Sequence, residues 1–165
     1  MKPSTRQQLM GVSTATLCTA QFKRGLSHQF VQDVRPLAAG LPNRVGEAYT
    51  LRYMPAREDL NTIEVFKNRE HPQRKAVEEC PPGAVLVIDS RKDACAASAG
   101  AILVSRLMKR GVAGVVSDGG FRDNPEIARL VIPAYHQRAA APTNLTLHEA
   151  FGVMREGLRT DEAAN

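Results

Sequence analysis

The stretch GAILVSRLMKRGVAGVVSDGGFRDNPE, residues 100–126, decides the fold class of this 165-residue chain. Its first half has the apolar spacing of an amphipathic helix that ends at Gly111. The apolar, β-branched run at 112–117 then indicates a buried strand. A glycine turn leads from this strand into a charged cluster at 122–126. This order is typical of an α/β protein whose polar groups follow the end of a strand.

A second buried strand is expected just before this stretch. The turn Pro81-Pro82-Gly83 leads into AVLVID at 84–89, which carries no charge before its final aspartate. Ser98 is expected to cap a helix that runs to about Arg110. Strand, helix and strand then form a βαβ unit, which should be parallel and right-handed.

The other elements follow from periodicity and from turn residues. Helical spacing is found at 5–25 (ended by Gly25), 62–67, 73–79, 124–130 and 147–163. Strand spacing is found at 45–53 and 132–135. Residues 26–43 are expected to form an irregular connection. We therefore expect a single domain over 1–150, followed by a helical or frayed tail at 151–165.

Composition narrows the function classes. Hydrophobic residues make up 43% of the chain, and no apolar run is long enough to span a bilayer, so we expect no membrane partner. The net charge of +5 suits an acidic partner, but aromatic residues are only 5% and no RNA-binding signature is found, which argues against direct nucleic-acid binding. Cys18, Cys80 and Cys95 form no CxxC pair and are expected to be reduced thiols of a cytoplasmic protein.

The charged cluster has the chemistry of a metal and substrate site. Asp123 is a suitable ligand for Mg²⁺, which prefers one or two carboxylates and keeps several waters. Glu126 would hold one of these waters or orient Arg122. The planar guanidinium of Arg122 suits a carboxylate or an enolate oxygen. The alternative is an Arg–Asp surface pair at a helix start, with Asp123 as the N-cap.

The turn at Ser98–Ile102 supplies a second set of polar groups. It is expected to follow a strand and to open a helix, so its free backbone N–H groups can hold an anion. Gly100 allows a close approach to the backbone, although helix packing explains this glycine equally well. Because the two turns should end neighbouring parallel strands, they are expected to converge on one crevice.

These residues resemble the RraA-like family, which includes the regulator of ribonuclease E activity A and the class II 4-hydroxy-4-methyl-2-oxoglutarate aldolases. The resemblance covers about residues 10–150 and rests on PPGAVLVID, the small-residue turn at 98–103, RGVAGVVSDGGFRD and Pro133. The family motif begins with a small residue, which is followed after a spacer of twenty residues by Arg-Asp. After two further residues the motif ends with Glu or Asp. Ala101, Arg122-Asp123 and Glu126 have this spacing.

The resemblance implies a fold, an activity and an assembly. The fold would be a swivelling β/β/α-type layered α/β domain with a central mixed sheet, assembled as a homotrimer or hexamer. The activity would be that of a Mg²⁺- or Mn²⁺-dependent lyase, which cleaves 4-hydroxy-4-methyl-2-oxoglutarate-type 2-oxo acids to pyruvate and decarboxylates oxaloacetate. Asp123 would hold the metal, with Glu126 behind it, and Asp123 and Arg122 would be catalytic. The substrate would be bound by Gly100, Ala101, Ile102, Leu103 and Arg122.

Two features differ from the family pattern. Ala101 occupies the position of a glycine, or of an aspartate that holds a metal-bound water in the aldolases. After APTNLTLHEA at 141–150, the sequence does not continue into the family's PGD turn and DGV strand, so the sheet is expected to lack its last strands. Both features favour an alternative, in which the chain is an inactive homologue or a non-catalytic regulator that binds a ribonuclease.

Overall fold

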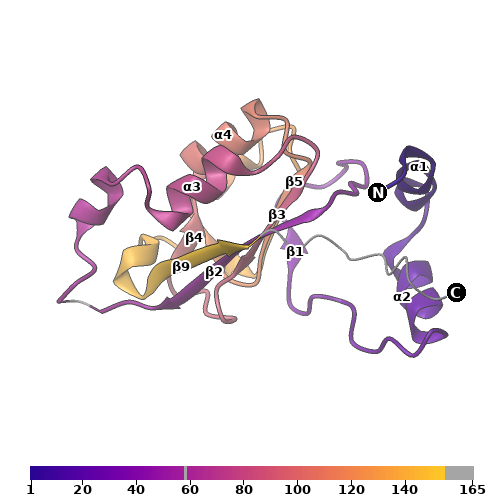
Figure 1. Cartoon of the computed structure of the whole chain (residues 1–165), viewed down its shortest axis with the longest axis horizontal. Coiled ribbons are helices and arrows are strands. Elements are labelled where there is room, and N and C mark those ends of the chain that lie inside the picture. The colour runs from indigo at the N-terminus through magenta and orange to yellow at the C-terminus, as the bar shows by residue number, and fades with distance from the viewer. Residues whose placement is uncertain (58, 155–165) are drawn as a thin grey trace, which may run out of the picture.

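A six-stranded mixed sheet forms the centre of the computed structural model, which describes residues 1–57 and 59–154 (Figure 1). The strands, in spatial order, are β1 (Arg35–Pro36), β7 (Ala134–His136), β5 (Gly114–Ser117), β3 (Val85–Asp89), β2 (Ala48–Pro55) and β9 (His148–Met154). The four inner strands are parallel, and the edge strands β1 and β9 run antiparallel to their neighbours. The predicted α/β class with a central mixed sheet is therefore confirmed.

A second, smaller sheet continues from three of these strands. It contains β4 (Ala97–Ala99), β6 (Gly120–Phe121) and β8 (Arg138–Ala139), all parallel. Along the chain, β3 leads to β4, β5 leads to β6, and β7 leads to β8. The Ser98 hydroxyl donates a hydrogen bond to the carbonyl of Gly120 over 2.9 Å, which ties β4 to β6 in the interior. The smaller sheet thus begins where the parallel strands of the larger one end.

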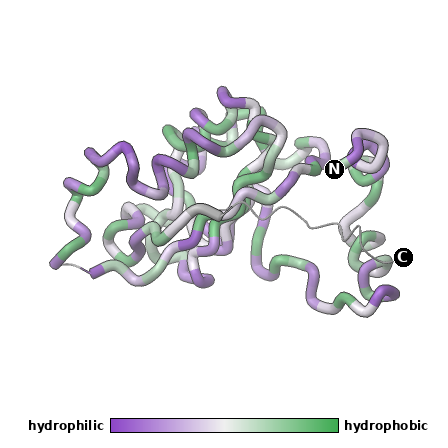
Figure 2. Tube along the Cα trace, viewed as in Figure 1, coloured by the Kyte–Doolittle hydropathy of each residue, from purple (hydrophilic) through white to green (hydrophobic). Residues whose placement is uncertain are grey.

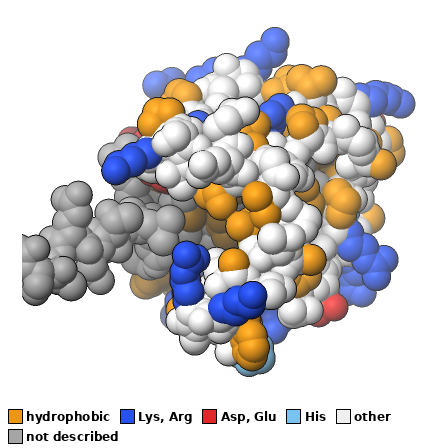
Figure 3. All heavy atoms as spheres, turned by 90° about the vertical axis from the view of Figure 1, so that its right-hand side faces the viewer, with side chains coloured by type: hydrophobic (Ala, Val, Ile, Leu, Met, Phe, Trp, Pro, Cys, Tyr) orange, Lys and Arg blue, Asp and Glu red, His pale blue; other side chains and the backbone are white. Residues whose placement is uncertain are grey.

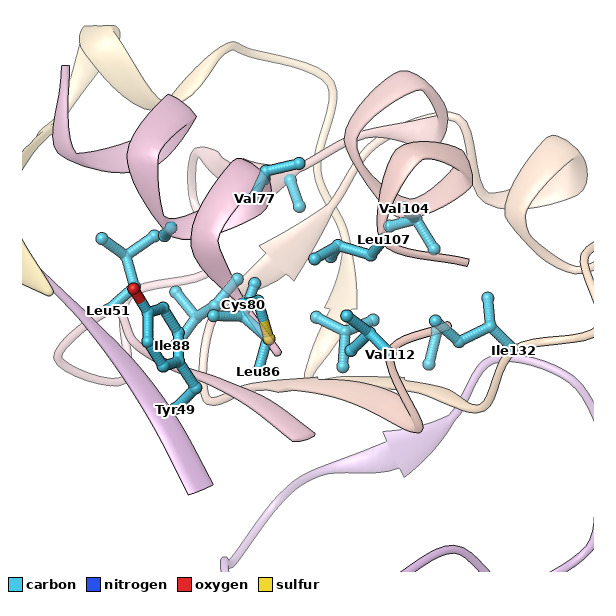
Figure 4. Close-up of a cluster of buried hydrophobic side chains, with 14 of the residues drawn as sticks. Tyr49, Leu51, Val77, Cys80, Leu86, Ile88, Val104, Leu107, Val112 and Ile132 are labelled. Atoms are coloured by element: carbon cyan, nitrogen blue, oxygen red, sulfur yellow. The ribbon is translucent and has the colours of Figure 1, made fainter. Parts of the chain in front are cut away.

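Helices α3 (Pro72–Glu79) and α4 (Ala101–Lys109) pack against the larger sheet (Figures 1 and 4). Val104 and Leu107 of α4 are fully buried, because their spacing of three residues places both on one face of the helix. They pack in one cluster with Leu86 and Ile88 of β3. The short helices are η1 (Ile63–Lys67), α5 (Asn124–Ile127) and η2 (Asn144–Thr146). Packing against this core fixes the position of α4 and therefore of its N-terminal end at Ala101.

The N-terminal region differs from the single helix expected at 5–25. Two helices are present, α1 (Pro3–Met10) and α2 (Thr14–Phe22), and neither buries a residue. The helix breaks because Ser13 is extended and its hydroxyl accepts a hydrogen bond from the Thr16 N–H over 3.2 Å, capping α2. Both helices lie away from the sheets (Figures 1 and 2), and apolar side chains at this end are exposed among Lys and Arg (Figure 3).

The helix predicted over 147–163 is wrong where the structure describes it. His148–Met154 form β9, which pairs antiparallel with β2. His148 and Ala150 alternate inward and are buried, a period of two that overrides the helical spacing. Pairing also covers the backbone groups that the edge of β2 would otherwise expose. Residues 155–165 of the predicted helix lie outside the described residues.

The predicted βαβ unit is confirmed, with one change. Strands β3 and β5 are parallel neighbours joined through α4, and the φ of +78° at Gly111 marks the end of the helix. Ser98 does not cap α4, because it lies within β4; Gly100 is the N-cap residue. No helix among the described residues is long and apolar enough to cross a membrane.

Candidate functional site

A cavity of about 180 Å³ lies at the C-terminal ends of β4 and β6. Ala99 and Phe121 are register partners in these strands, and the Arg122 N–H donates to the carbonyl of Ala99 over 3.0 Å. The two turns singled out in the sequence therefore do converge, but at the ends of the smaller sheet rather than of β3 and β5. The residues that line the cavity are Phe66, Gln73, Arg74, Ala97, Ala99, Gly100, Ile102, Leu103, Arg122, Asp123, Thr143 and Asn144.

Asp123 caps α4 from a distant part of the chain. Its Oδ2 accepts a hydrogen bond from the Ala101 N–H over 3.1 Å. Asp123 precedes α5, but its side chain makes no cap hydrogen bond to that helix. A left-handed backbone, with φ 58° and ψ 39°, turns its carboxylate away from α5. Asp123 is therefore the N-cap residue of α5 in an exposed Arg–Asp pair, as the alternative expected, but its carboxylate caps α4 instead of its own helix.

Gly100 makes room for this carboxylate. A Cβ atom at position 100 would lie 2.7 Å from Asp123 Oδ2 and 2.9 Å from Arg122 Nε. These distances are shorter than carbon atoms tolerate, so any side chain would displace Asp123, Arg122 or both. The absence of a side chain at position 100 thus allows the two charged side chains to lie in their observed positions.

Arg122 lies beside Asp123 without being neutralised in a buried pair. Its Nε is 3.8 Å from Asp123 Oδ2, and the two side chains are 45% and 43% exposed. An ion pair at this distance and exposure contributes little free energy, so both groups keep their charge available for a ligand. No other carboxylate of the described chain lies within ion-pair distance of Arg122.

The N-terminus of α4 adds backbone donors on the same side. The N–H groups of Ile102 and Leu103 have no acceptor within the described residues, as expected for the first turn of a helix. The helix dipole adds partial positive charge at this end. The predicted anion-binding backbone therefore lies beside Arg122 and Asp123, because all four residues line the cavity.

Glu126 is less closely connected to the site. It belongs to α5, its backbone N–H donates to the carbonyl of Asp123 over 3.1 Å, and it does not line the cavity. Its carboxylate forms no ion pair within the part of the chain that the structure describes, so Arg122 is not oriented by it. Its role near a metal ion remains a prediction.

The donor set of the site suits a hard divalent cation. Asp123 Oδ1 has no hydrogen-bond donor among the described residues and is free to coordinate. Within residues 1–57 and 59–154, no three His, Cys, Asp or Glu side chains come together as a metal-binding group. One carboxylate with room for waters and substrate oxygens fits Mg²⁺ or Mn²⁺ better than the closed nitrogen and sulfur sets of Zn²⁺. The predicted cofactor is thus compatible with the residues present.

The lining of the cavity also contains a fixed amide, Gln73 of α3, that the motif did not identify. Gln73 Nε2 donates to Tyr53 Oη over 2.7 Å and to the carbonyl of Ser98 over 3.1 Å. The orientation of the amide is defined, because a carbonyl oxygen can only accept. Burial raises the pKa of Tyr53, so its hydroxyl stays protonated and donates to the Ser98 carbonyl over 3.0 Å. A glutamine on the apolar face of the predicted helix at 73–79 was the available signal.

Phe121, the residue before Arg122, anchors the end of β6 in the protein interior. It is fully buried and stacks on His136, with ring centroids 5.4 Å apart. His136 Nδ1 accepts a hydrogen bond from the Phe121 N–H over 3.3 Å, which requires an unprotonated nitrogen. Burial lowers the pKa of His136, which is consistent with this neutral state. The imidazole therefore holds the end of β6 in place and does not line the cavity.

The fold and the site define a layered α/β protein with an Arg–Asp pair facing a helix N-terminus. The family described as RraA-like: Aldolase/RraA matches residues 14–158. Since this match covers most of the chain, the protein belongs to the RraA-like family, which includes aldolases and ribonuclease inhibitors.

Solved structures agree with this placement. RraAS2 of Streptomyces coelicolor, described as an unusual member of the RNase ES inhibitor RraA family, is 28% identical with a TM-score of 0.74, covering 93% of this chain and 72% of that one. RraA of Thermus thermophilis, described as an RNA-processing inhibitor, is 23% identical with a TM-score of 0.60, over 81% and 71% of the two chains. An uncharacterized Pseudomonas syringae protein is 19% identical with a TM-score of 0.74, over 93% and 66%. The last two show the fold alone.

Proposed function

We propose that this protein is a divalent-metal-dependent lyase acting on 2-oxo acids. The observation that carries the proposal is the meeting of Asp123, Arg122 and the free N–H groups of Ile102 and Leu103 at one cavity. A carboxylate for a metal, a permanent cation and backbone donors are the groups that a 2-oxo acid needs. Membership of a family that contains aldolases supports the same reading.

Substrate binding follows from the charges of the site. The N–H groups of Ile102 and Leu103 would hold the carboxylate next to the 2-oxo group, helped by the dipole of α4. The Arg122 guanidinium would contact the 2-oxo oxygen.

The proposed reaction is retro-aldol cleavage of 4-hydroxy-4-methyl-2-oxoglutarate-type substrates. The C3–C4 bond breaks, its electron pair moves toward the 2-oxo oxygen, and the 4-hydroxyl group loses its proton as it becomes a carbonyl. Arg122 would stabilise the negative charge that develops on the 2-oxo oxygen. A metal ion bound by Asp123 would supply further positive charge there. Protonation at C3 then yields pyruvate, and loss of CO₂ from oxaloacetate would use the same charge stabilisation.

Ala101 marks the main difference from the aldolase pattern. A methyl group at the first position of α4 cannot hold a water or carry a proton, so a low turnover number is expected. The same feature favours a second candidate function, a non-catalytic regulator that binds a ribonuclease. The similarity to RraAS2 of Streptomyces coelicolor supports this candidate.

We also propose that the protein assembles with copies of itself, as a homotrimer or hexamer in the cytoplasm. Helices α1 and α2 bury no residue. Phe22 at the end of α2 and Phe30 in the segment that follows it are both exposed. Exposed apolar residues grouped in this way are typical of protein contacts. Sedimentation of the purified full chain would give the assembly size.

The lyase proposal is tested by mixing the purified protein with Mg²⁺ and oxaloacetate and following pyruvate above the rate with Mg²⁺ alone. Arg122→Ala and Asp123→Ala should each abolish release. Survival of the activity in both variants would contradict the assignment. No release by the wild type, with tight binding to a ribonuclease, would favour the regulator.

A further inference from the structure

A second hollow adjoins the candidate site. It has a volume of about 540 Å³ and lies between α3 and the first turn of α4. Arg74, Ile102 and Leu103 line both this hollow and the site cavity, so the two spaces are adjacent. The other lining residues are Arg69, Val77, Glu78 and Arg106. The second hollow therefore lies next to the space that a ligand held at Arg122 would occupy.

The cations of the hollow are not equally available. Arg106 donates to Glu78, with Nη2 2.7 Å from Oε2, and the same carboxylate lies 3.7 Å from Arg110. Arg69 and Arg74 form no ion pair among the described residues, although Arg74 adds to the effect of Arg106 and Arg110 in lowering the pKa of Glu78. The hollow thus combines an engaged Arg–Glu pair with two arginines that form no ion pair among the described residues.

Of these two arginines, Arg74 is the one that lines both spaces. It follows Gln73 on α3, and the side chain of Gln73 is fixed by its hydrogen bonds to Tyr53 and Ser98. Ile102, which is 80% exposed, lines the site cavity together with Arg74 and Arg122. The lining therefore includes two cations and an exposed apolar side chain.

We propose that Arg74 is a specificity-determining residue that binds a carboxylate at the end of the substrate distant from the 2-oxo group. The inference rests on the proposed function for the position of the 2-oxo acid. A guanidinium fork suits a carboxylate, and Ile102 suits the short carbon chain between the two charged ends. A 2-oxo acid with a terminal methyl group would gain nothing from Arg74.

Binding measurements separate this recognition from turnover. Two probes of equal carbon number, 2-oxoglutarate and 2-oxopentanoate, would be titrated into the full-length protein with Mg²⁺ by calorimetry. Arg74→Ala should weaken 2-oxoglutarate binding about tenfold or more, because a hydrogen-bonded charge pair is lost, and leave 2-oxopentanoate nearly unchanged. Arg44→Ala, which removes an arginine that lines neither space, should change neither affinity.

If Arg74→Ala changed the affinity for both probes equally, or for neither, the role of Arg74 would be overturned. The same holds if the wild type binds neither probe or binds both with equal affinity. Arg74-dependent preference for 2-oxoglutarate in a protein that cleaves no 2-oxo acid would support the recognition and contradict the lyase. Cleavage of a 2-oxo acid without this preference would support the lyase and contradict the role of Arg74.

Discussion

The carboxylate of Asp123 occupies the space that a side chain at Gly100 would need, since a Cβ atom there would lie 2.7 Å from Asp123 Oδ2. The two residues are 23 positions apart in the sequence (123 − 100) but meet where β4 and β6 end. The carboxylate of Asp123 also accepts a hydrogen bond over 3.1 Å from the N–H of Ala101, the residue that follows Gly100. The start of α4 and the Arg-Asp motif therefore form one structural unit.

This contact predicts the effect of Gly100→Ala. The backbone of Gly100 is extended, with φ −135° and ψ −180°, so alanine is not strained there. The new methyl group would instead push Asp123 and Arg122 apart. Lyase activity, as kcat/KM, should fall about tenfold or more because the charged groups are misplaced. The free energy of unfolding should change by no more than about 1 kcal/mol.

Gly152→Ala is the matched control for this variant, because a Cβ at Gly152 meets no atom within 4 Å. It should leave kcat/KM unchanged. If Gly100→Ala were as active as the control, the close contact between Gly100 and Asp123 would have no functional importance.

Leu107→Ala tests how α4 is held in place. Leu107 is fully buried against the larger sheet (Figure 4). Its truncation should lower the free energy of unfolding by about 2–5 kcal/mol, since methyl groups leave the core and a cavity remains. Ile102→Ala on the same helix removes an 80% exposed side chain and should change it by about 0.5 kcal/mol at most. Urea unfolding measures both; equal effects would contradict the packing of this helix face.

The folded state should lose stability as the pH falls below neutrality, partly through His136. Burial, the larger cause, lowers its pKa in the folded protein, opposed by a backbone hydrogen bond with Arg138. The unfolded chain therefore takes up its proton first, at a pKa of about 6.5. The stabilisation is complete above that value and is lost as the pH falls toward the folded-state pKa, by at most about 1.4 kcal/mol per pH unit.

His136→Asn isolates this contribution. The other three of the four histidines are present in both proteins, so the difference in pH dependence belongs to His136. Unfolding free energies at several pH values between neutral and mildly acidic should show a shallower dependence for the variant. Parallel curves for the two proteins would show that His136 does not have a lowered pKa.

The elements with strong periodicity could be predicted from the sequence. The strand at 84–89, the helix ended by Gly111 and the strand at 112–117 correspond to β3, α4 and β5. Their signals are local, because each has a continuous apolar face and a glycine or proline boundary. The convergence of the two turns was also predicted, although the structure places it at the ends of β4 and β6 rather than of β3 and β5.

Other features depend on contacts that the local sequence does not encode. Strand β9 is extended because it pairs with β2, although His148–Met154 also fit a helical spacing. The smaller sheet has strands of two or three residues, too short to show a period. Gln73, Arg74 and Asn144 line the site only because α3 and η2 pack beside β4, so no motif marks them.

The most direct test of the central claim is the rate of pyruvate release from 4-hydroxy-4-methyl-2-oxoglutarate, with Mg²⁺ and with EDTA, for the wild type and Asp123→Asn. Asparagine tolerates the left-handed backbone at position 123, where φ is 58°, so the variant removes charge without strain. We predict Mg²⁺-dependent release of two pyruvates per substrate by the wild type, and a loss of about 100-fold or more in the variant. Equal rates for the two proteins, or release that EDTA does not suppress, would contradict a metal-dependent site at Asp123.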